Sequence, residues 1–350
     1  MPRRATRLLI PAVGLACVVA YAQAPDSPPA KPKTSLVDRP APDVQTLPDD
    51  EYGRLARYGH ELSTRTFAYI GPEVKNRKMR FAGNNLACTS CHQEGATKPF
   101  AMPWVGVTSV FPQYRGREDA VSTLEERVNG CMERSMNGKP LPLDSREMKA
   151  FVTYFHFLSR DIPVGAELEG TATKQIKAPN RRADLAAGKA VYEKYCASCH
   201  GENGEGVRVG VRGDARGYIY PPVWGSDSFN TGAGMNRLLM AMRFFKQNMP
   251  LEANHKSPIL TDDEAYDVAG YIVSKPRPEK ANLEKDFPAR WNKPIDAAFP
   301  PYVDGMPADQ HKYGPFPPLA EKARELAARH AEEQKAKKAK EPQASPPAKP

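Results

Sequence analysis

Two copies of the pattern Cys-x-x-Cys-His constrain this 350-residue chain more than any other feature, the first at residues 88–92 and the second at 196–200. In this pattern two thiols attach the porphyrin of a c-type haem, and the adjacent histidine is placed to ligate the iron. A zinc site is the alternative for a single copy, but two copies, each after a predicted helix, favour haem. We therefore expect two covalently bound haem c groups, attached through Cys88, Cys91, Cys196 and Cys199 and ligated by His92 and His200.

The first 24 residues have the pattern of an export signal. Three arginines precede an apolar stretch at residues 8–20, and Ala-Tyr-Ala at 20–22 is a small-x-small cleavage site. The apolar stretch is short for a bilayer, and no later run reaches the ~20 residues that a span requires. A retained anchor is the alternative. Because c-type haem is attached outside the cytoplasm, we expect a periplasmic protein with no stable membrane span after signal cleavage.

The formal net charge is +9, and it falls to +6 without the three leader arginines. A basic chain can bind nucleic acid, but export, two haem motifs and the absence of a nucleic-acid motif argue against that partner. A small anionic substrate or an acidic redox partner fits the charge better.

Each haem motif is flanked by the same order of predicted elements: a helix before it, a loop after it and a final helix. In the first half the helices are expected at residues 49–66 and after Asp144-x-x-Glu147, with a shorter one at 121–129. In the second half Asp184 is a plausible N-cap, and Thr261-x-x-Glu264 resembles a capping box. The motifs lie 108 residues apart, which indicates a divergent internal duplication.

The predicted fold is therefore mainly α, with two cytochrome c-like domains in tandem, an irregular Pro-rich linker and terminal extensions. The expected organisation begins with a signal peptide at 1–24, a flexible linker at 25–47 and a first cytochrome c domain with the active-site haem at 48–160. An interdomain linker at 161–182 leads to a second cytochrome c domain with the electron-transfer haem at 183–278. An irregular strap at 279–318 and a charged, largely disordered tail at 319–350 follow, and residues 321–338 of the tail have the composition of a helix.

Cys131 is the one cysteine of the mature chain that the haem motifs leave unassigned, since Cys17 lies in the leader. A free thiol is hazardous in an oxidising compartment unless it is protected or used. It is either a buried thiol, a partner in an intermolecular disulfide, or a thiolate ligand of the first iron. As a ligand, the thiolate would lower the reduction potential and act as a sulfur nucleophile. Met102, Met132 and Met136 are the other candidate ligands in this half.

Four arginines lie near Cys131 in sequence, at positions 115, 117, 127 and 134. Such a cluster would help to deprotonate the thiol and would bind an oxoanion through paired hydrogen bonds. A solvated basic face is the alternative interpretation of these arginines.

The second haem requires a soft axial ligand from the second half of the chain. Met249 is favoured because it precedes Pro250 and follows a predicted helix, where cytochromes c often carry their methionine. Met/His ligation raises the reduction potential, which suits a haem at which electrons leave. The other candidates are Met235, Met240, Met242 and His255.

Several short motifs occur here in a fixed order: Pro-Trp-Val-Gly at 103–106, Tyr-Arg-Gly-Arg at 114–117, the run Arg-Val-Asn-Gly-Cys-Met-Glu-Arg-Ser-Met-Asn-Gly at 127–138, and a second haem motif with Asn-Met-Pro at 248–250. In this order the chain resembles the dihaem thiosulfate dehydrogenases of the TsdA type, a cytochrome c family related to SoxA. The resemblance covers about residues 50–278, and the segment around Cys131 is its most specific part.

The resemblance implies that two thiosulfates are joined to tetrathionate with release of two electrons, or the reverse. It implies that His92 and Cys131 ligate the active-site haem and that Arg117, Arg127 and Ser135 bind substrate. It further implies that His200 and Met249 ligate the electron-transfer haem, from which electrons pass to a soluble cytochrome or another periplasmic acceptor. Some members carry a lysine before that methionine as an alternative ligand; Asn248 stands here instead.

Two other functions remain open from the sequence. A non-catalytic dihaem electron-transfer cytochrome would leave Cys131 and the arginines unexplained. A SoxA-like sulfur-oxidation subunit would carry its substrate as a cysteine persulfide and would need a partner cytochrome, which a complete second haem domain makes less necessary.

Overall fold

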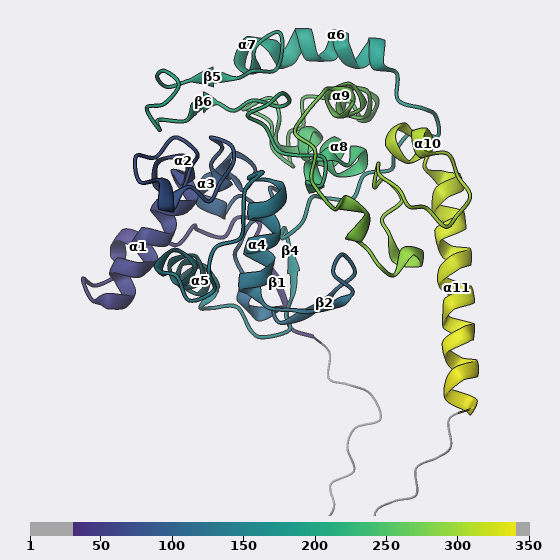
Figure 1. The fold of residues 1–350 in the computed structure, drawn as a ribbon, viewed down its shortest axis with the longest axis horizontal. Helices are drawn as coiled ribbons and strands as arrows, with labels where there is room; N and C mark the ends of the chain where they lie inside the picture. The colour runs from purple at the N-terminus through teal and green to yellow at the C-terminus, as the bar shows by residue number, and fades with distance from the viewer. Residues whose placement is uncertain (1–30, 341–350) are drawn as a thin grey trace, which may run out of the picture. The chain divides into compact units, whose positions relative to one another are not determined.

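The computed structural model describes residues 31–340, so the export signal expected at 1–24 lies outside the described residues. Helices dominate the fold, which confirms the mainly α prediction (Figure 1). The helices are α1 (Glu51–Thr64), α2 (Thr66–Tyr69), α3 (Gln93–Ala96), α4 (Leu124–Arg134), α5 (Arg146–Ser159), α6 (Leu185–Tyr195), α7 (Ala197–His200), α8 (Leu238–Asn248), α9 (Asp262–Ser274), α10 (Ala308–Tyr313) and α11 (Pro317–Lys340).

Three small two-stranded sheets accompany the helices. The pairs are β1 (Lys33–Ser35) with β4 (Glu167–Glu169), which is parallel, and β2 (Gln113–Arg115) with β3 (Ala120–Ser122) and β5 (Val207–Arg208) with β6 (Tyr218–Tyr220), which are antiparallel. In residues 31–340, no helix is both long enough and apolar enough to cross a membrane.

The two halves of the chain repeat one helix crossing. In the first half α1 packs on α5, and a Cβ on Gly59 would collide with the carbonyl oxygen of Ala150. In the second half α6 packs on α9, where a Cβ on Gly188 would collide with the carbonyl oxygen of Asp267. Glycine thus lets each pair of helices approach closely. α1 also contacts the short helical turn at Cys88–Ser90, and α6 leads directly into the second motif, so each crossing lies next to a haem motif.

The helix caps follow the sequence signals with one exception. The Asp184 carboxylate accepts from the first turn of α6, and Thr261 and Glu264 form the predicted capping box of α9. At α5, however, Ser145 is the N-cap in place of Asp144, and its hydroxyl accepts from the Met148 amide. Serine and aspartate cap equally well, so the sequence alone did not resolve which neighbour does so.

The segment expected as a flexible linker at 25–47 is ordered where the structure describes it. β1 pairs with β4, and Leu36 and Val44 are 2% and 4% exposed in a core shared with α1 and α5. The high content of Pro, Ala and Lys and the weak apolar periodicity suggested a flexible linker, but these two apolar side chains are buried in that core, which favours an ordered segment.

The C-terminal segment also differs from the largely disordered tail expected at 319–350, because α11 runs through to Lys340. Its start is held by the fully buried Leu319, and its middle by His330 stacked on Trp291. Alanine, glutamate and lysine, which favour helix, make up most of the remainder. The expected helix at 321–338 lies inside α11, and residues 341–350 lie outside the described part.

Candidate functional site

A cavity of about 110 Å³, which we call cavity A, lies beside the first haem motif. Its wall includes Cys88, Cys91 and His92 of the motif, together with Cys131 from α4. The surrounding surface is mostly apolar and includes Trp104, Phe151 and Phe155. Both attachment thiols and two candidate iron ligands therefore face one apolar space, which is the arrangement that a covalently attached haem requires.

α4 and its C-cap residue present three polar side chains to cavity A at intervals of four residues: Arg127, Cys131 and the C-cap Ser135. Side chains four apart lie on one helix face, so this stripe follows from helical geometry. The capping box of Thr123 and Glu126 sets where the helix begins. Arg127 Nη1 lies 2.7 Å from Cys131 Sγ, and the charge of Cys131 raises the pKa of Arg127 above its ordinary value.

His92 has the protonation and orientation of an iron ligand. Its Nδ1 lies 2.5 Å from the carbonyl oxygen of Met102, and because a carbonyl can only accept, Nδ1 carries the proton. Burial lowers the pKa of His92 to about 4, so the ring is neutral and Nε2 keeps a free lone pair. A backbone carbonyl that orients a histidine in this way is the usual outer partner of a metal ligand.

The arginines near Cys131 divide into two groups. Arg115, on β2, has a buried Nη1 that makes no hydrogen bond within residues 31–340 and lies 3.5 Å from the Glu118 carboxylate. Burial lowers the pKa of Arg115, and the neighbouring charge of Arg127 lowers it further. Arg115 and Arg127 thus form a positive region beside Cys131.

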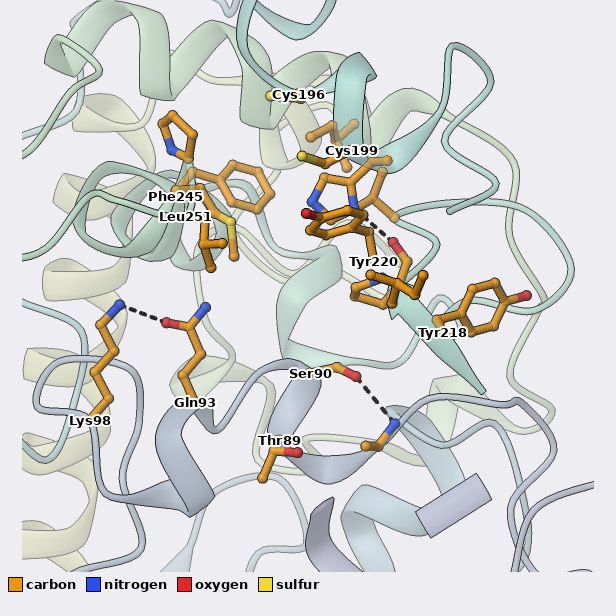
Figure 2. A pocket seen from close by; sticks show the side chains of 18 of the residues that line it. Thr89, Ser90, Gln93, Lys98, Cys196, Cys199, Tyr218, Tyr220, Phe245 and Leu251 are labelled. Atoms are coloured by element: carbon orange, nitrogen blue, oxygen red, sulfur yellow. Dashed lines mark hydrogen bonds between the residues drawn. The ribbon is translucent and has the colours of Figure 1, made fainter. Parts of the chain in front are cut away.

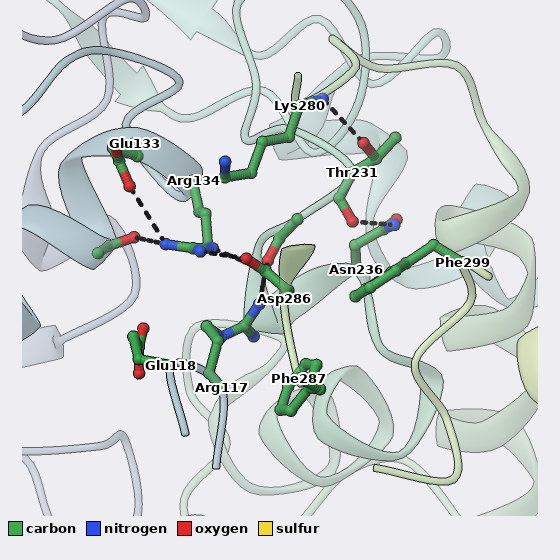
Figure 3. Close-up of polar contacts among 12 residues, drawn as sticks. Arg117, Glu118, Glu133, Arg134, Thr231, Asn236, Lys280, Asp286, Phe287 and Phe299 are labelled. Carbon is green, nitrogen blue, oxygen red and sulfur yellow. Dashed lines mark hydrogen bonds and ion pairs between the residues drawn. The ribbon is translucent and has the colours of Figure 1, made fainter. Parts of the chain in front are cut away.

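Arg117 and Arg134 instead form an ion-pair cluster with Asp286, which comes from the strap (Figure 3). Arg134 Nε and Nη2 lie 3.1 and 2.5 Å from the two carboxylate oxygens, and Arg117 Nη1 lies 2.5 Å from one of them. Arg117 also packs over the Phe287 ring, 4.7 Å from its centroid. Of the four residues predicted for catalysis and substrate binding, the structure brings Arg127, Cys131 and Ser135 together at cavity A, and it directs Arg117 to Asp286.

A larger cavity of about 620 Å³, cavity B, lies beside the second haem motif. Cys196, Cys199 and His200 line it together with Met249, the residue directly after α8. His200 Nδ1 donates to the carbonyl oxygen of Pro221 at 2.7 Å, as His92 does in the first half. Burial lowers the pKa of His200 below its usual value. The donor set of cavity B therefore fits a haem with histidine and methionine as axial ligands.

None of the other candidate ligands for the second haem lines cavity B. Met235, proposed for the second haem, lines cavity A, and Met242 is fully buried in the core of the second half. Met240 Sδ accepts from the Thr173 hydroxyl, and the His255 ring lies against Phe100. In the first half Met132 and Met136 are buried and line cavity A, whereas Met102 contributes its carbonyl to His92.

Three contacts between distant segments carried no usable signal in the sequence. Asp286 lies in an irregular segment that no motif distinguishes. Phe229 and Met235 reach cavity A from the second half of the chain. Conversely, Thr89, Ser90, Gln93 and Lys98 of the first half line cavity B (Figure 2). Each depends on how the two halves pack, which hydrophobic periodicity does not reveal.

Comparison with known proteins agrees with this geometry. Residues 78–164 match the family model described as SoxA/TsdA, cytochrome c domain, and residues 185–275 match cytochrome c. The chain is 40% identical over 247 residues to the thiosulfate dehydrogenase of Psychrobacter arcticus, covering 71% of each chain. It is 39% identical to the thiosulfate dehydrogenase of Allochromatium vinosum, covering 76% of this chain and 90% of that one.

A solved structure of the thiosulfate dehydrogenase TsdBA from Marichromatium purpuratum, in its as-isolated form, is similar with a TM-score of 0.62 and 31% identity. The match covers 69% of this chain and 50% of that chain, so the similarity extends over half of the longer protein.

Proposed function

The chain belongs to the thiosulfate dehydrogenase family of cytochromes c, and on this premise we propose that it joins two thiosulfates into tetrathionate at cavity A. It is a dihaem oxidoreductase that acts on thiosulfate, with one haem c attached to each cytochrome c domain. The observation that carries the proposal is the stripe of Arg127, Cys131 and Ser135, which sets a sulfur nucleophile between a cation and a hydroxyl.

Arg127 and Ser135 supply the contacts for a thiosulfate dianion. Arg127 donates to Cys131 Sγ and keeps further N–H groups for an oxoanion, and the fixed positive charge of Arg115 adds to its field. Because these donors are already oriented in an apolar pocket, their stabilisation of the anion requires little reorganisation.

Cys131 is the nucleophile in the proposed reaction. Its thiolate and the terminal sulfur of one thiosulfate form a sulfur–sulfur bond, and two electrons leave. The terminal sulfur of the second thiosulfate then attacks the sulfur that came from the first. This step releases tetrathionate and restores the Cys131 thiolate, so the sum is two thiosulfates to one tetrathionate and two electrons.

His92 and Cys131 would hold the iron of the first haem, and His200 and Met249 that of the second. The two haems, when bound, accept the two electrons one at a time and pass them on. Thiolate ligation lowers a potential and methionine ligation raises it, so this ligand set favours electron flow from cavity A to cavity B and hence thiosulfate oxidation.

In this proposal Arg117, which forms an ion pair with Asp286, contributes positive charge to the substrate site. We assign the active-site haem to residues 48–160 and the electron-transfer haem to 183–278. We also assign the protein to the periplasm, with a soluble cytochrome or another periplasmic protein as acceptor, because haem c is attached outside the cytoplasm.

The test is the Cys131→Ala variant, compared with the wild-type protein for haem content, electron paramagnetic resonance of the oxidised state and thiosulfate-dependent reduction. We expect both haems to stay attached, a low-spin thiolate-haem signal to vanish and turnover to be abolished. Unchanged spectra with retained turnover would exclude Cys131 as nucleophile. Unchanged spectra in a protein that never responds to thiosulfate would favour a plain electron-transfer cytochrome.

A further inference from the structure

Lys98 belongs to the first half of the chain, yet its side chain lines cavity B, the site of the second haem. We propose that the Lys98 ammonium binds a propionate of the second haem, so that the first cytochrome c domain completes the haem site of the second. The proposal depends on attachment of that haem and is independent of the reaction at cavity A.

The direction of cavity B supports this assignment. Figure 2 shows Cys196 and Cys199 on one side of the cavity and Thr89, Ser90, Gln93 and Lys98 on the opposite side. In haem c the two propionates are on the pyrrole rings opposite those that carry the thioether bonds. A porphyrin attached at Cys196 and Cys199 therefore directs its carboxylates towards the segment that contains Lys98.

The charges lining cavity B complement such a ligand. Its charged side chains are the cations Lys98 and Arg216 and the single carboxylate Glu94, whose charge raises the pKa of Lys98 but less than burial lowers it, and a haem brings two more carboxylates. Lys98 Nζ lies 2.9 Å from Gln93 Oε1 and 3.5 Å from the Ala253 carbonyl oxygen. Within the described chain, no carboxylate forms an ion pair with it. Burial lowers the pKa of Lys98, because an ammonium that leaves water needs a compensating charge.

The neighbouring groups can share the same ligand. The Ser90 hydroxyl accepts from the Ala87 N–H and keeps its own proton to donate, whereas the Thr89 hydroxyl donates to the Ser63 carbonyl; the side-chain amide nitrogen of Gln93 remains a donor while its oxygen accepts from Lys98. Ser90 and Thr89 lie between Cys88 and Cys91 of the first haem motif. The second haem would thereby rest on the segment that binds the first, which brings the two cofactors close together.

The contact has an electrostatic consequence. A propionate carries negative charge and stabilises ferric iron, and an ammonium that neutralises it favours the reduced state. Lys98 is thus a positioning residue that raises the potential of the electron-exit haem. Replacing it with a neutral side chain should lower that potential, whereas an arginine should preserve most of it.

The experiment is a redox titration of the haem-loaded full chain, followed by electron paramagnetic resonance so that the two ferric haems are distinguished by their ligands. The variants are Lys98→Gln, Lys98→Arg and the control Lys256→Gln; Lys256 pairs with the exposed Asp38 away from the cavity wall. We expect Lys98→Gln to shift the reduction equilibrium of the second haem about tenfold, or ~59 mV downward for one electron. Lys98→Arg should keep most of the wild-type potential, and Lys256→Gln should leave the potential unchanged.

Three results would overturn the proposal. A second-haem potential that is the same in Lys98→Gln and in the wild type would mean that no propionate depends on this ammonium. A changed axial-ligand signal in Lys98→Gln would mean that the Lys98 nitrogen binds iron instead of a carboxylate. An equal shift of the potential in Lys256→Gln would mean that the effect comes from the net charge of the protein, and this result would also refute the proposal.

Discussion

Asp286 of the strap pairs with two arginines of the first domain, so a substitution at this position tests how the strap and the first domain are held together. The Asp286→Asn substitution keeps the shape of the side chain and removes its charge. In the wild-type protein the carboxylate is 7% exposed, and the side chains of its partners Arg134 and Arg117 are 10% and 14% exposed. The substitution therefore removes the carboxylate partner of Arg117 and leaves Arg134 with the more distant Glu133 carboxylate, 3.5 Å away, while both guanidinium groups stay away from water.

The expected destabilisation follows from that burial. Removing one partner of a buried ion pair costs about 3–5 kcal/mol. The control is Asp309→Asn, which removes the same charge from the Arg182–Asp309 pair, whose side chains are 48% and 60% exposed. An exposed pair contributes about 0–1 kcal/mol. The loss of unfolding free energy should therefore be severalfold larger in Asp286→Asn than in Asp309→Asn.

The assay is urea unfolding of the haem-loaded proteins followed by far-ultraviolet circular dichroism, repeated across a range of pH. Burial by itself raises the pKa of Asp286, but the hydrogen bonds and charges of Arg134 and Arg117 outweigh it, and the net pKa lies below the ordinary value. A depressed carboxylate pKa gives stability that is complete above the unfolded-state pKa, about 3.9, and is lost as the pH falls through the folded-state value. The difference in unfolding free energy between the wild type and Asp286→Asn should be constant from about pH 8 to 5 and should shrink below about pH 4.

The reasoning is refuted if Asp286→Asn unfolds at the same urea concentration as Asp309→Asn. It is equally refuted if the stability gap does not narrow in acid, because the effect would then not come from the ionised carboxylate.

Three further outcomes are expected. Arg127→Lys keeps the charge but loses the planar fork beside Cys131, and since a hydrogen bond to a charged group contributes about 1.5–3 kcal/mol, kcat/KM for thiosulfate should fall roughly 10- to 150-fold at unchanged haem content. Met249→His should lower the midpoint potential of one haem in a redox titration, because methionine ligation raises it; an unchanged potential would mean that Met249 is not a ligand. Gly188→Ala should lower the melting temperature by overpacking the α6–α9 crossing at about 1–3 kcal/mol, whereas Gly234→Ala, with open space around it, should not.

Signals between residues close together in the chain account for much of the fold. The capping residues Asp184 and Thr261 mark where α6 and α9 begin, because a cap involves residues only two or three apart. The same holds for the haem motifs, in which two thiols and a histidine are fixed by adjacent positions. The stripe of Arg127, Cys131 and Ser135 is different: the helix expected at 121–129 ends before Cys131, whereas α4 runs to Arg134 and so places these side chains, about one turn apart, on one face.

The sequence by itself thus determined the haem motifs and the mainly α class, because both depend on residues close together in the chain. The tertiary structure alone decided that Asp286 pairs with Arg134, 152 positions earlier, and that Lys98 of one half faces the haem cavity of the other. It also decided that the segment around Leu36 is ordered. The physical reason is that these contacts depend on burial and charge pairing between distant segments, and only the packed chain brings such segments together.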